Sequence, residues 1–312
     1  MSDVLKVSGL GRTFGSGVRP LVAVEDVSFT LAEGETLGVV GESGCGKSTL
    51  ARMILKLLPA TTGRIEIAGQ DVTDLEESRM RPLRRQIQAV FQDPVSSLNP
   101  RMRVRDIVAE PMRAAGVEAD ARAGRVDEML SIVGMPADAG ERYPHAFSGG
   151  QRQRIAIARA LASNPRIVVC DEATSALDVS VQAQVLNLLR DLRARFGLSM
   201  LFISHNLGAV RHVGDRVAVM YLGRIVELGS EADIFERPAH PYTQALIAAV
   251  PEPTADSVAP PPLAGEIPSA RDRPTGCHFH PRCPKAQARC RVEDAMLAER
   301  RANHLVRCHF PN

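Results

Sequence analysis

The sequence predicts an α/β protein in which helices flank a mixed β-sheet, and three observations support this prediction. An apolar segment at residues 37–40, a glycine-rich loop and an amphipathic segment at residues 50–58 follow one another as strand, loop and helix. Short apolar strands are predicted at residues 87–91, 166–170 and 198–203, with helical patterns between them. A hairpin is predicted at residues 216–228, so the sheet contains antiparallel as well as parallel neighbours.

Ahead of this sheet, the chain predicts an antiparallel layer of strands at residues 4–7 and 22–31. Residues 11–17 are rich in glycine and predict the loop between them. Phe14 lies in this loop, where it serves either as a small hydrophobic anchor or as a platform on which adenine stacks. The residues alone leave both interpretations open.

The loop at residues 41–49 matches the pattern G-x-x-x-x-G-K-[ST]. Its glycines let backbone N–H groups point inward around phosphate oxygens, and the helix that follows adds the positive end of its dipole. A lysine at this position reaches the outer phosphates, and the next hydroxyl can ligate Mg²⁺. The candidate phosphate-binding residues are Gly41, Ser43, Gly44, Cys45, Gly46, Lys47, Ser48 and Thr49.

A helix-rich stretch interrupts the strands, with helices predicted at residues 104–115, 121–133 and 150–162. We therefore expect an inserted helical subdomain over about residues 93–162. The segment Phe147-Ser148-Gly149-Gly150-Gln151 opens the last helix. Ser148 is a plausible N-cap, and the small residues around it leave a helix terminus that suits an anion.

Polar side chains follow three of the predicted core strands. Gln92 ends the strand at 87–91 and can reach a metal ion and an attacking water. Asp171 and Glu172 end the strand at 166–170, which places one carboxylate to hold Mg²⁺ and leaves the other to orient or deprotonate water. His205 follows the strand at 198–203 on the ligand side of a parallel sheet, so phosphate contact is expected.

Composition limits the class of protein. The 312 residues are 45% hydrophobic and carry a formal net charge of +2, values typical of a globular chain and not of a protein that binds polyanions through bulk charge. No nucleic-acid partner is expected. We see neither a signal peptide nor an apolar run of about 18 residues, so we expect a cytoplasmic protein whose membrane role depends on other subunits.

The end of the chain changes character. Residues 251–275 are rich in proline and predict an extended linker, and residues 276–312 form a short cysteine-rich module. Four thiolates can bind Zn²⁺ or hold an iron–sulfur cluster. The spacing fits no common pattern for either, so both remain open, as do four free thiols. The cysteines are Cys277, Cys283, Cys290 and Cys308.

Taken in order, the motifs over residues 4–250 resemble those of ATP-binding cassette (ABC) ATPases, the nucleotide-binding subunits of ABC transporters. The resemblance rests on a Walker A motif at 41–49, a Q-loop at Gln92, a signature at 147–151, a Walker B motif at 167–172, a D-loop at 175–178 and a switch histidine at His205. Phe147 stands where leucine is most usual in the signature. The implied fold is the ABC ATPase core with its antiparallel β layer and helical subdomain.

Segments at residues 93–100, 142–147 and 240–246, together with the cysteine tail, resemble the oligopeptide/dipeptide importer ATPases more narrowly. Residues 45 and 48–52 resemble the F-type subunit, which pairs with a D-type paralogue. The implied activity is ATP hydrolysis that drives uptake of di- and oligopeptides. The implied partners are a second ATPase subunit, two transmembrane permease subunits and an extracytoplasmic solute-binding protein, with this chain at the cytoplasmic face of the inner membrane. Import of nickel or glutathione, or a soluble ABC ATPase of DNA repair or translation, are the alternatives.

The resemblance also implies roles for single residues. Phe14 stacks on adenine, Lys47 holds the phosphates, Glu172 polarises the attacking water and His205 contacts the γ-phosphate. The resemblance further implies a Mg²⁺ shell of Ser48, Gln92 and Asp171, a contact to the partner subunit's ATP from Ser148, Gly149, Gly150, Gln151 and Asp178, and a [4Fe–4S] cluster on Cys277, Cys283, Cys290 and Cys308.

Overall fold

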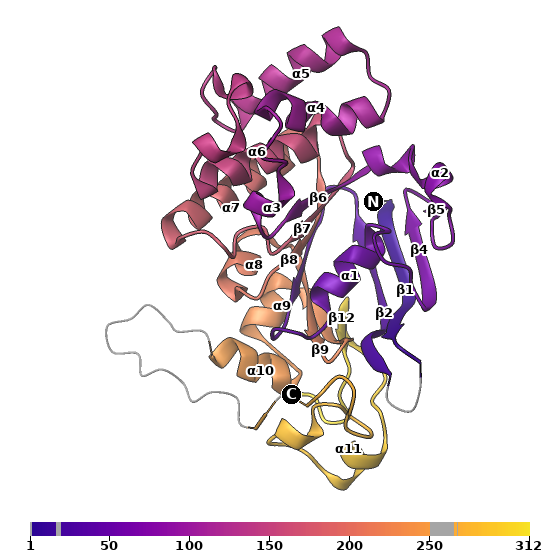
Figure 1. Ribbon diagram of the computed structural model, residues 1–312. Coiled ribbons are helices and arrows are strands. Elements are labelled where there is room, and N and C mark those ends of the chain that lie inside the picture. Colours follow the sequence, from indigo (N-terminus) through magenta and orange to yellow (C-terminus); the bar gives the residue numbers. More distant parts are fainter. Residues whose placement is uncertain (1, 17–19, 250–264, 267) are drawn as a thin grey trace. The chain divides into compact units, whose positions relative to one another are not determined.

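The computed structural model describes residues 2–16, 20–249, 265–266 and 268–312 (Figure 1). The chain divides into two compact units. The first unit comprises residues 1–5, 30–36 and 66–203. The second comprises residues 6–29, 37–65 and 204–312. Most of the expected proline-rich linker, residues 251–264 and 267, lies outside the described residues.

The first unit contains three parallel strands with β7 in the middle: β6 (Ile87–Phe91), β7 (Ile167–Asp171) and β8 (Ser199–Ile203). All five residues of β7 and of β8 are buried, which explains why all of them except Asp171 and Ser199 are apolar. The last residues of the three strands are in register, because Asp171 pairs with both Phe91 and Ile203. The residues that follow β6 and β7 therefore emerge at one edge of this sheet.

Three helices of the first unit pack together: α4 (Val104–Ala114), α5 (Ala119–Ile132) and α6 (Gly149–Ala162) (Figure 1). They match the predicted spans to within two residues at each end. The helix α6 also packs on β6 and on α7 (Val179–Phe196). The short helix α3 (Pro94–Ser97) was not predicted, because a single turn is too short to show periodicity. A second short helix, α2 (Glu77–Met80), precedes β6.

The strands of the second unit follow the order β11 (Ala298–Arg301), β12 (His304–Val306), β10 (Arg224–Ser230), β9 (Arg216–Tyr221) and β3 (Thr36–Val40). β3 and β9 are parallel, and the other neighbours are antiparallel. The hairpin of β9 and β10 confirms the prediction. The two strands from the tail were not predicted, and β12 pairs directly with β10.

The helices of the second unit are α1 (Lys47–Ile54), α8 (Leu207–Val213), α9 (Glu231–Glu236), α10 (Pro241–Ala248) and α11 (Ala288–Val292). The short helix α8 was not predicted. The tail does not stand apart in this unit, and its ribbon runs beside α10 (Figure 1). Asn312 N donates to Ala239 O, and the Phe279 ring contacts the Tyr242 ring of α10.

A further sheet contains β2 (Leu21–Ala32), β1 (Asp3–Phe14), β4 (Thr62–Ile67) and β5 (Gln70–Asp71) in that order. The expected antiparallel layer is present, but β1 runs to Phe14, so the prediction that residues 11–14 are loop was wrong. Hydrogen bonds to Thr61 support the longer strand, because Thr61 N donates to Gly11 O and Thr13 N donates to Thr61 Oγ1.

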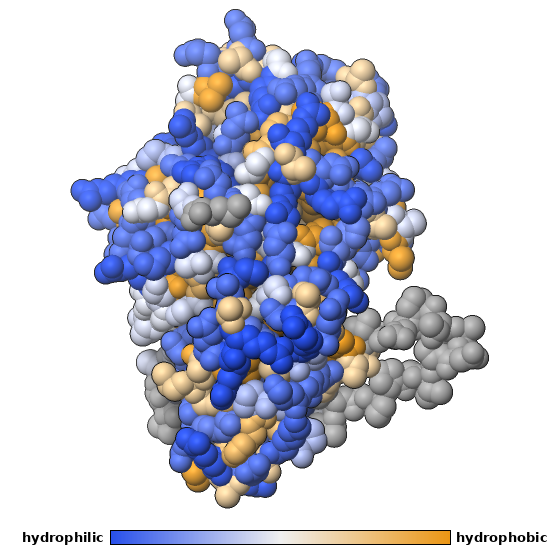
Figure 2. All heavy atoms as spheres, turned by 180° about the vertical axis from the view of Figure 1, so that it is seen from behind, coloured by the Kyte–Doolittle hydropathy of each residue, from blue (hydrophilic) through white to orange (hydrophobic). Residues whose placement is uncertain are grey.

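Hydrophilic side chains cover most of the face shown in Figure 2, with apolar residues exposed only in small groups. Within the described residues, no helix is both long enough and apolar enough to cross a bilayer. The exposed large apolar side chains of the described residues are scattered along the chain: Leu57, Tyr143, Val179, Val292 and Met296.

Candidate nucleotide site

The phosphate-binding loop lies in the second unit between β3 and α1. Gly46 is the N-cap of α1 and has a φ of 106°, a conformation that side chains strongly disfavour. A Cβ at this position would overlap the Ala23 carbonyl oxygen, so only glycine fits. The N-cap of α1 is thus a glycine, which has no side chain to accept a hydrogen bond, and the positive end of the helix dipole faces the loop without an acceptor from the N-cap.

Lys47 is held inside this loop and is only 4% exposed. Its Nζ donates to Gly41 O at 2.8 Å and to Glu42 O at 3.0 Å, and lies 3.7 Å from Cys45 Sγ. Burial raises the pKa of Cys45, although Lys47 opposes that shift, so this cysteine is a buried thiol. The lysine is thus in place to exchange loop carbonyls for phosphate oxygens.

Phe14 and His205 belong to the same unit as this loop. Phe14 is half-buried, and the guanidinium carbon of Arg12 lies 4.7 Å from its ring centroid. His205 is exposed and directly follows Ser204, whose N–H donates to Val39 O at 3.1 Å. This hydrogen bond places the histidine segment beside the strand that leads into the phosphate-binding loop.

Gln92, Asp171 and Glu172 lie in the first unit, at the shared edge of β6 and β7. Gln92 is exposed, and Asp171 is only 7% exposed. Glu172 has a φ of 51°, in the left-handed region that costs a side chain free energy. The surrounding backbone holds it there: Glu172 N donates to Ile203 O at 2.9 Å, and Glu172 O accepts from both N and Oγ of Ser175. The Cα–Cβ bond of Glu172 thus leaves the end of the strand in a fixed direction.

The signature segment begins α6 as predicted. Ser148 and Gln151 form a reciprocal capping box, in which Ser148 Oγ accepts from Gln151 N and Gln151 Oε1 accepts from Ser148 N. The Gly149 backbone is exposed. Gly150 has a packing reason to be glycine, because a Cβ there would overlap Val181 Cγ1 of α7.

Asp178 caps α7. Its Oδ1 accepts from Val181 N at 2.9 Å and from Ser180 Oγ at 2.8 Å. These hydrogen bonds, with that of Val181 N the largest, lower the pKa of Asp178. The carboxylate therefore has a local structural role in the first unit whatever it contacts in a partner subunit.

Arg159, which was not among the predicted site residues, links two of these motifs. Arg159 lies on α6, and its Nη1 donates to Ser97 O at 2.6 Å, in the segment that follows Gln92. Burial lowers the pKa of Arg159. Its helical position gave no signal, because an arginine on an amphipathic helix is most often solvated.

Two further residues that the sequence analysis did not assign to the site contact the phosphate-binding loop in the second unit. Glu42 N donates to the Tyr242 hydroxyl at 3.0 Å, and the Glu42 carboxylate pairs with Arg282. Both partners are far from the loop in sequence, so no local pattern could have found them.

The four tail cysteines line one cavity in the second unit, together with His240, Phe279 and other side chains. Burial raises the pKa of Cys277 to about 11, and the three other thiols add to that shift, so the four lie near one another. Within the described residues, no group of three or more His, Cys, Asp or Glu side chains could hold a metal ion. The geometry therefore gives no support to a site for a single Zn²⁺.

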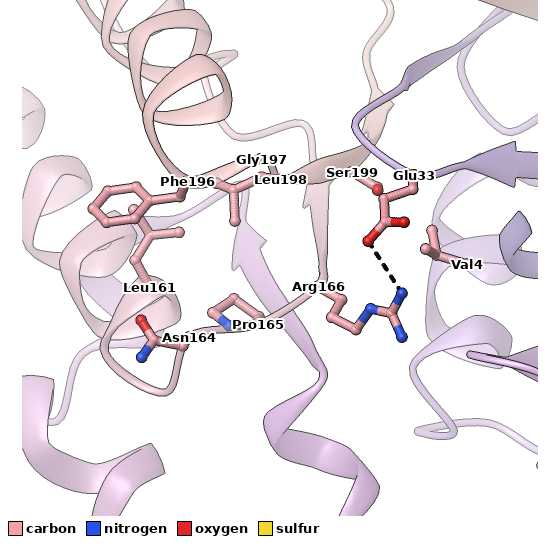
Figure 3. A pocket seen from close by; sticks show the side chains of 10 residues that line it. All are labelled: Val4, Glu33, Leu161, Asn164, Pro165, Arg166, Phe196, Gly197, Leu198 and Ser199. Atoms are coloured by element: carbon pink, nitrogen blue, oxygen red, sulfur yellow. Dashed lines mark hydrogen bonds and ion pairs between the residues drawn. The ribbon is translucent and has the colours of Figure 1, made fainter. Parts of the chain in front are cut away.

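The first unit also contains a pocket of about 280 Å³, which is lined by residues outside the nucleotide motifs (Figure 3). An ion pair of 3.2 Å between Arg166 and Glu33 closes one side of it, and Phe196 lines another. None of the residues predicted to bind nucleotide lines this pocket. We therefore do not assign it to the nucleotide.

Comparison with known proteins agrees with the motif order. Residues 24–175 match the model of the ABC transporter family, and residues 226–290 match that of the oligopeptide/dipeptide transporter C-terminal region. A probable peptide ABC transporter ATP-binding protein of Sinorhizobium fredii is 51% identical, over 99% of this chain and 90% of that protein. The oligopeptide transport ATP-binding protein AppF of Bacillus subtilis is 48% identical, over 95% of this chain and 92% of its own length.

Among solved structures, a dimeric ATP-binding cassette bound to ADP and Pi in a post-hydrolysis state has a TM-score of 0.66 and is 29% identical, covering 73% of this chain and 98% of that one. A subunit of an ABC transporter complex from Clostridium perfringens has a TM-score of 0.68 and 27% identity, covering 76% of this chain and 92% of its own. The fold is thus that of an ABC ATPase cassette with mixed sheets. The chain belongs to the ATP-binding proteins of the ABC transporter family, in the branch that carries the oligopeptide/dipeptide transporter C-terminal region.

Proposed function

We propose that this chain is the ATP-hydrolysing subunit of an ABC importer that takes up di- and oligopeptides through separate membrane subunits. The observation that supports this best is the phosphate-binding loop, in which the buried Lys47 donates to loop carbonyls and a glycine is the N-cap of the following helix. The two relatives named above, both described as peptide or oligopeptide transport proteins, match nearly the whole chain.

We assign the chemical steps by residue. Phe14 stacks on adenine, and Lys47 with the amides of Gly41, Ser43, Gly44, Cys45, Gly46 and Thr49 holds the phosphates. Ser48, Gln92 and Asp171 would hold Mg²⁺, which when bound would supply positive charge beside the phosphates. Glu172 orients the attacking water and accepts its proton, and His205 donates to the γ-phosphate as charge develops.

The site is completed by a second cassette. Ser148, Gly149, Gly150 and Gln151, with Asp178, contact the ATP held by a D-type paralogue, and that subunit returns the same contacts. ATP then joins the two cassettes, and loss of phosphate after hydrolysis separates them. Two permease subunits and an extracytoplasmic solute-binding protein complete the importer, which places this chain at the cytoplasmic face of the inner membrane.

We propose a functional division into a nucleotide-binding domain (residues 1–250, with a helical subdomain near 93–162), a linker (251–275) and a cysteine-rich module (276–312). Four thiols that line one cavity suit a [4Fe–4S] cluster better than a single ion, because each cysteine of a cluster binds a different iron and the four need not converge on one point. A bound cluster would fasten the tail and takes no part in hydrolysis. Anaerobically purified protein should then contain iron and sulfide in equal amounts, and both should be lost in Cys290→Ser. Zinc, or no metal, would contradict the cluster.

The test of the function is ATP hydrolysis by the assembled importer in liposomes, with and without binding protein loaded with peptide. Peptide should stimulate turnover. Glu172→Gln should lower the rate of ATP hydrolysis at least about 100-fold while ATP still binds. The matched control is Glu77→Gln, which alters an exposed carboxylate paired with Arg84 and should leave turnover unchanged. If no peptide stimulates ATP hydrolysis, peptide import is refuted. If ATP hydrolysis persists in Glu172→Gln, the assignment of Glu172 is refuted.

A further inference from the structure

The carboxyl-terminal segment reaches the phosphate-binding loop through one side chain. Arg282 Nη1 donates to Glu42 Oε2 at 2.8 Å, and Arg282 Nη2 donates to Glu42 Oε1 at 2.9 Å. The Arg282 side chain is 3% exposed and the Glu42 side chain 19%. Two parallel hydrogen bonds to one carboxylate fix both orientation and distance, and burial protects the pair from screening by salt.

Aromatic rings hold the arginine in place. Its guanidinium carbon lies 5.8 Å from the Tyr221 ring centroid and 5.9 Å from that of Phe279. Phe279 is buried and also packs against Tyr242, with ring centroids 5.4 Å apart. Since the Tyr242 hydroxyl accepts from Glu42 N, both the backbone and the side chain of Glu42 are held by this cluster.

Charge explains why the loop needs this arginine. Glu42 is the second residue of the phosphate-binding loop, and a triphosphate brings several negative charges to the same place. With Lys47 alone, the charges of Glu42 and Lys47 cancel, and the carboxylate would repel the phosphates. With Arg282 bonded to Glu42, the three side chains carry a net charge of +1, and the carboxylate is directed toward the guanidinium.

We propose that Arg282 is a positioning residue for the nucleotide site: it is the counterion of Glu42, and by neutralising that carboxylate it keeps the loop electropositive for phosphate. The inference rests on the proposed function, in that the loop is taken as the phosphate site. It adds a regulatory link, because Arg282 directly precedes Cys283 in the tail. A change that disorders the tail therefore breaks the Arg282–Glu42 pair and alters the affinity for nucleotide.

The test is a double-mutant cycle in the assembled importer, with the Kd of a fluorescent ATP analogue and the KM for ATP as readouts. Arg282→Gln should raise both about tenfold, within the usual range of coupling between sites, because it leaves Glu42 unneutralised. Adding Glu42→Gln to that variant should return Kd to within about twofold of wild type. A merely structural arginine would not be rescued by removal of the charge it faces.

The control is Arg289→Gln, which removes an exposed tail arginine paired with Glu293 and should leave Kd unchanged. A Kd for Arg282→Gln within about twofold of wild type, or a double variant as weak as Arg282→Gln alone, would overturn the inference. If circular dichroism shows that Arg282→Gln does not fold, Glu42→Gln alone decides. It should bind the analogue as tightly as wild type or more tightly, and weaker binding refutes the counterion role.

Lys47→Ala separates this inference from the proposed function. It should abolish binding of the analogue. Normal binding in Lys47→Ala would refute the loop as the phosphate site, and the role of Arg282 with it. Loss of binding in Lys47→Ala, together with normal binding in Arg282→Gln, would refute only the role of Arg282.

Discussion

Acid should destabilise this protein through His240, which is 1% exposed at the start of α10. Burial lowers the pKa of His240 from 6.5 to about 3, with a small opposing effect from a hydrogen bond to the Arg307 backbone. His240 Nδ1 accepts from Tyr242 N at 3.0 Å, so a proton on Nδ1 would break the cap of α10. The backbone N–H of His240 meanwhile donates to the buried carboxylate of Glu227.

The sign of the effect follows from which state binds the proton. The unfolded chain takes up the proton near pH 6.5, whereas the folded chain resists it down to about pH 3. Stability from the neutral imidazole is therefore full above pH 6.5 and is lost as the pH falls toward 3. Each pH unit in this window removes about 1.4 kcal/mol, so that roughly 2 kcal/mol is gone at pH 5.

The assay is urea unfolding followed by circular dichroism at several pH values between 7.5 and 5, on wild type and His240→Asn. Asparagine keeps an acceptor for the Tyr242 N–H but does not titrate, so the variant should lose less stability over this range, by roughly 2 kcal/mol. His240→Asn also loses the packing of the imidazole ring on Phe279. That loss lowers the free energy of unfolding equally at each pH and does not alter its slope against pH. His145→Asn changes an exposed histidine and is the control. Equal slopes in wild type and His240→Asn would refute the argument.

Two more predictions concern α7. Gly150→Ala should lower the free energy of unfolding by about 1–3 kcal/mol, because the added Cβ overlaps Val181. Val181→Ala in the same chain should restore most of the loss in urea melts. If it does not, the two helices do not meet at this point. Asp178→Ala should lower the free energy of unfolding by about 1 kcal/mol through loss of the cap. Asp178→Asn keeps the acceptor and should cost less than half of that. If both variants lose the same stability, the charge of Asp178 matters and not its hydrogen bonds.

Most of the nucleotide motifs were predictable because their physics is local. The run of buried β-branched residues in β7 and the glycine, lysine and serine that begin α1 all act within about ten residues of one another. The prediction for residues 11–14 failed because a glycine-rich stretch can also be a strand when a neighbour supplies its hydrogen bonds. Here the neighbour is Thr61, about 50 positions away.

The supports of the site were not predictable because they join residues far apart in sequence. Arg282 and Glu42 are separated by 240 positions, and Arg159 and Ser97 by 62. An arginine beside a cysteine gives no sign of its partner until the chain is folded. The pairing of β12 with β10 is equally hidden, because β12 has only three residues and shows no alternation of its own.

These distant contacts explain why the tail and the phosphate-binding loop fall in one compact unit. β12 pairs with β10, β10 with β9, and β9 with β3, the strand that runs into the loop. Tyr221 at the end of β9 packs on both Tyr242 and Phe279, so the same strand that pairs with β3 also carries the aromatic cluster. The loop is therefore positioned by its own strand from one direction and by Arg282 and Tyr242 from another. Loss of either support should change nucleotide affinity before it unfolds the unit.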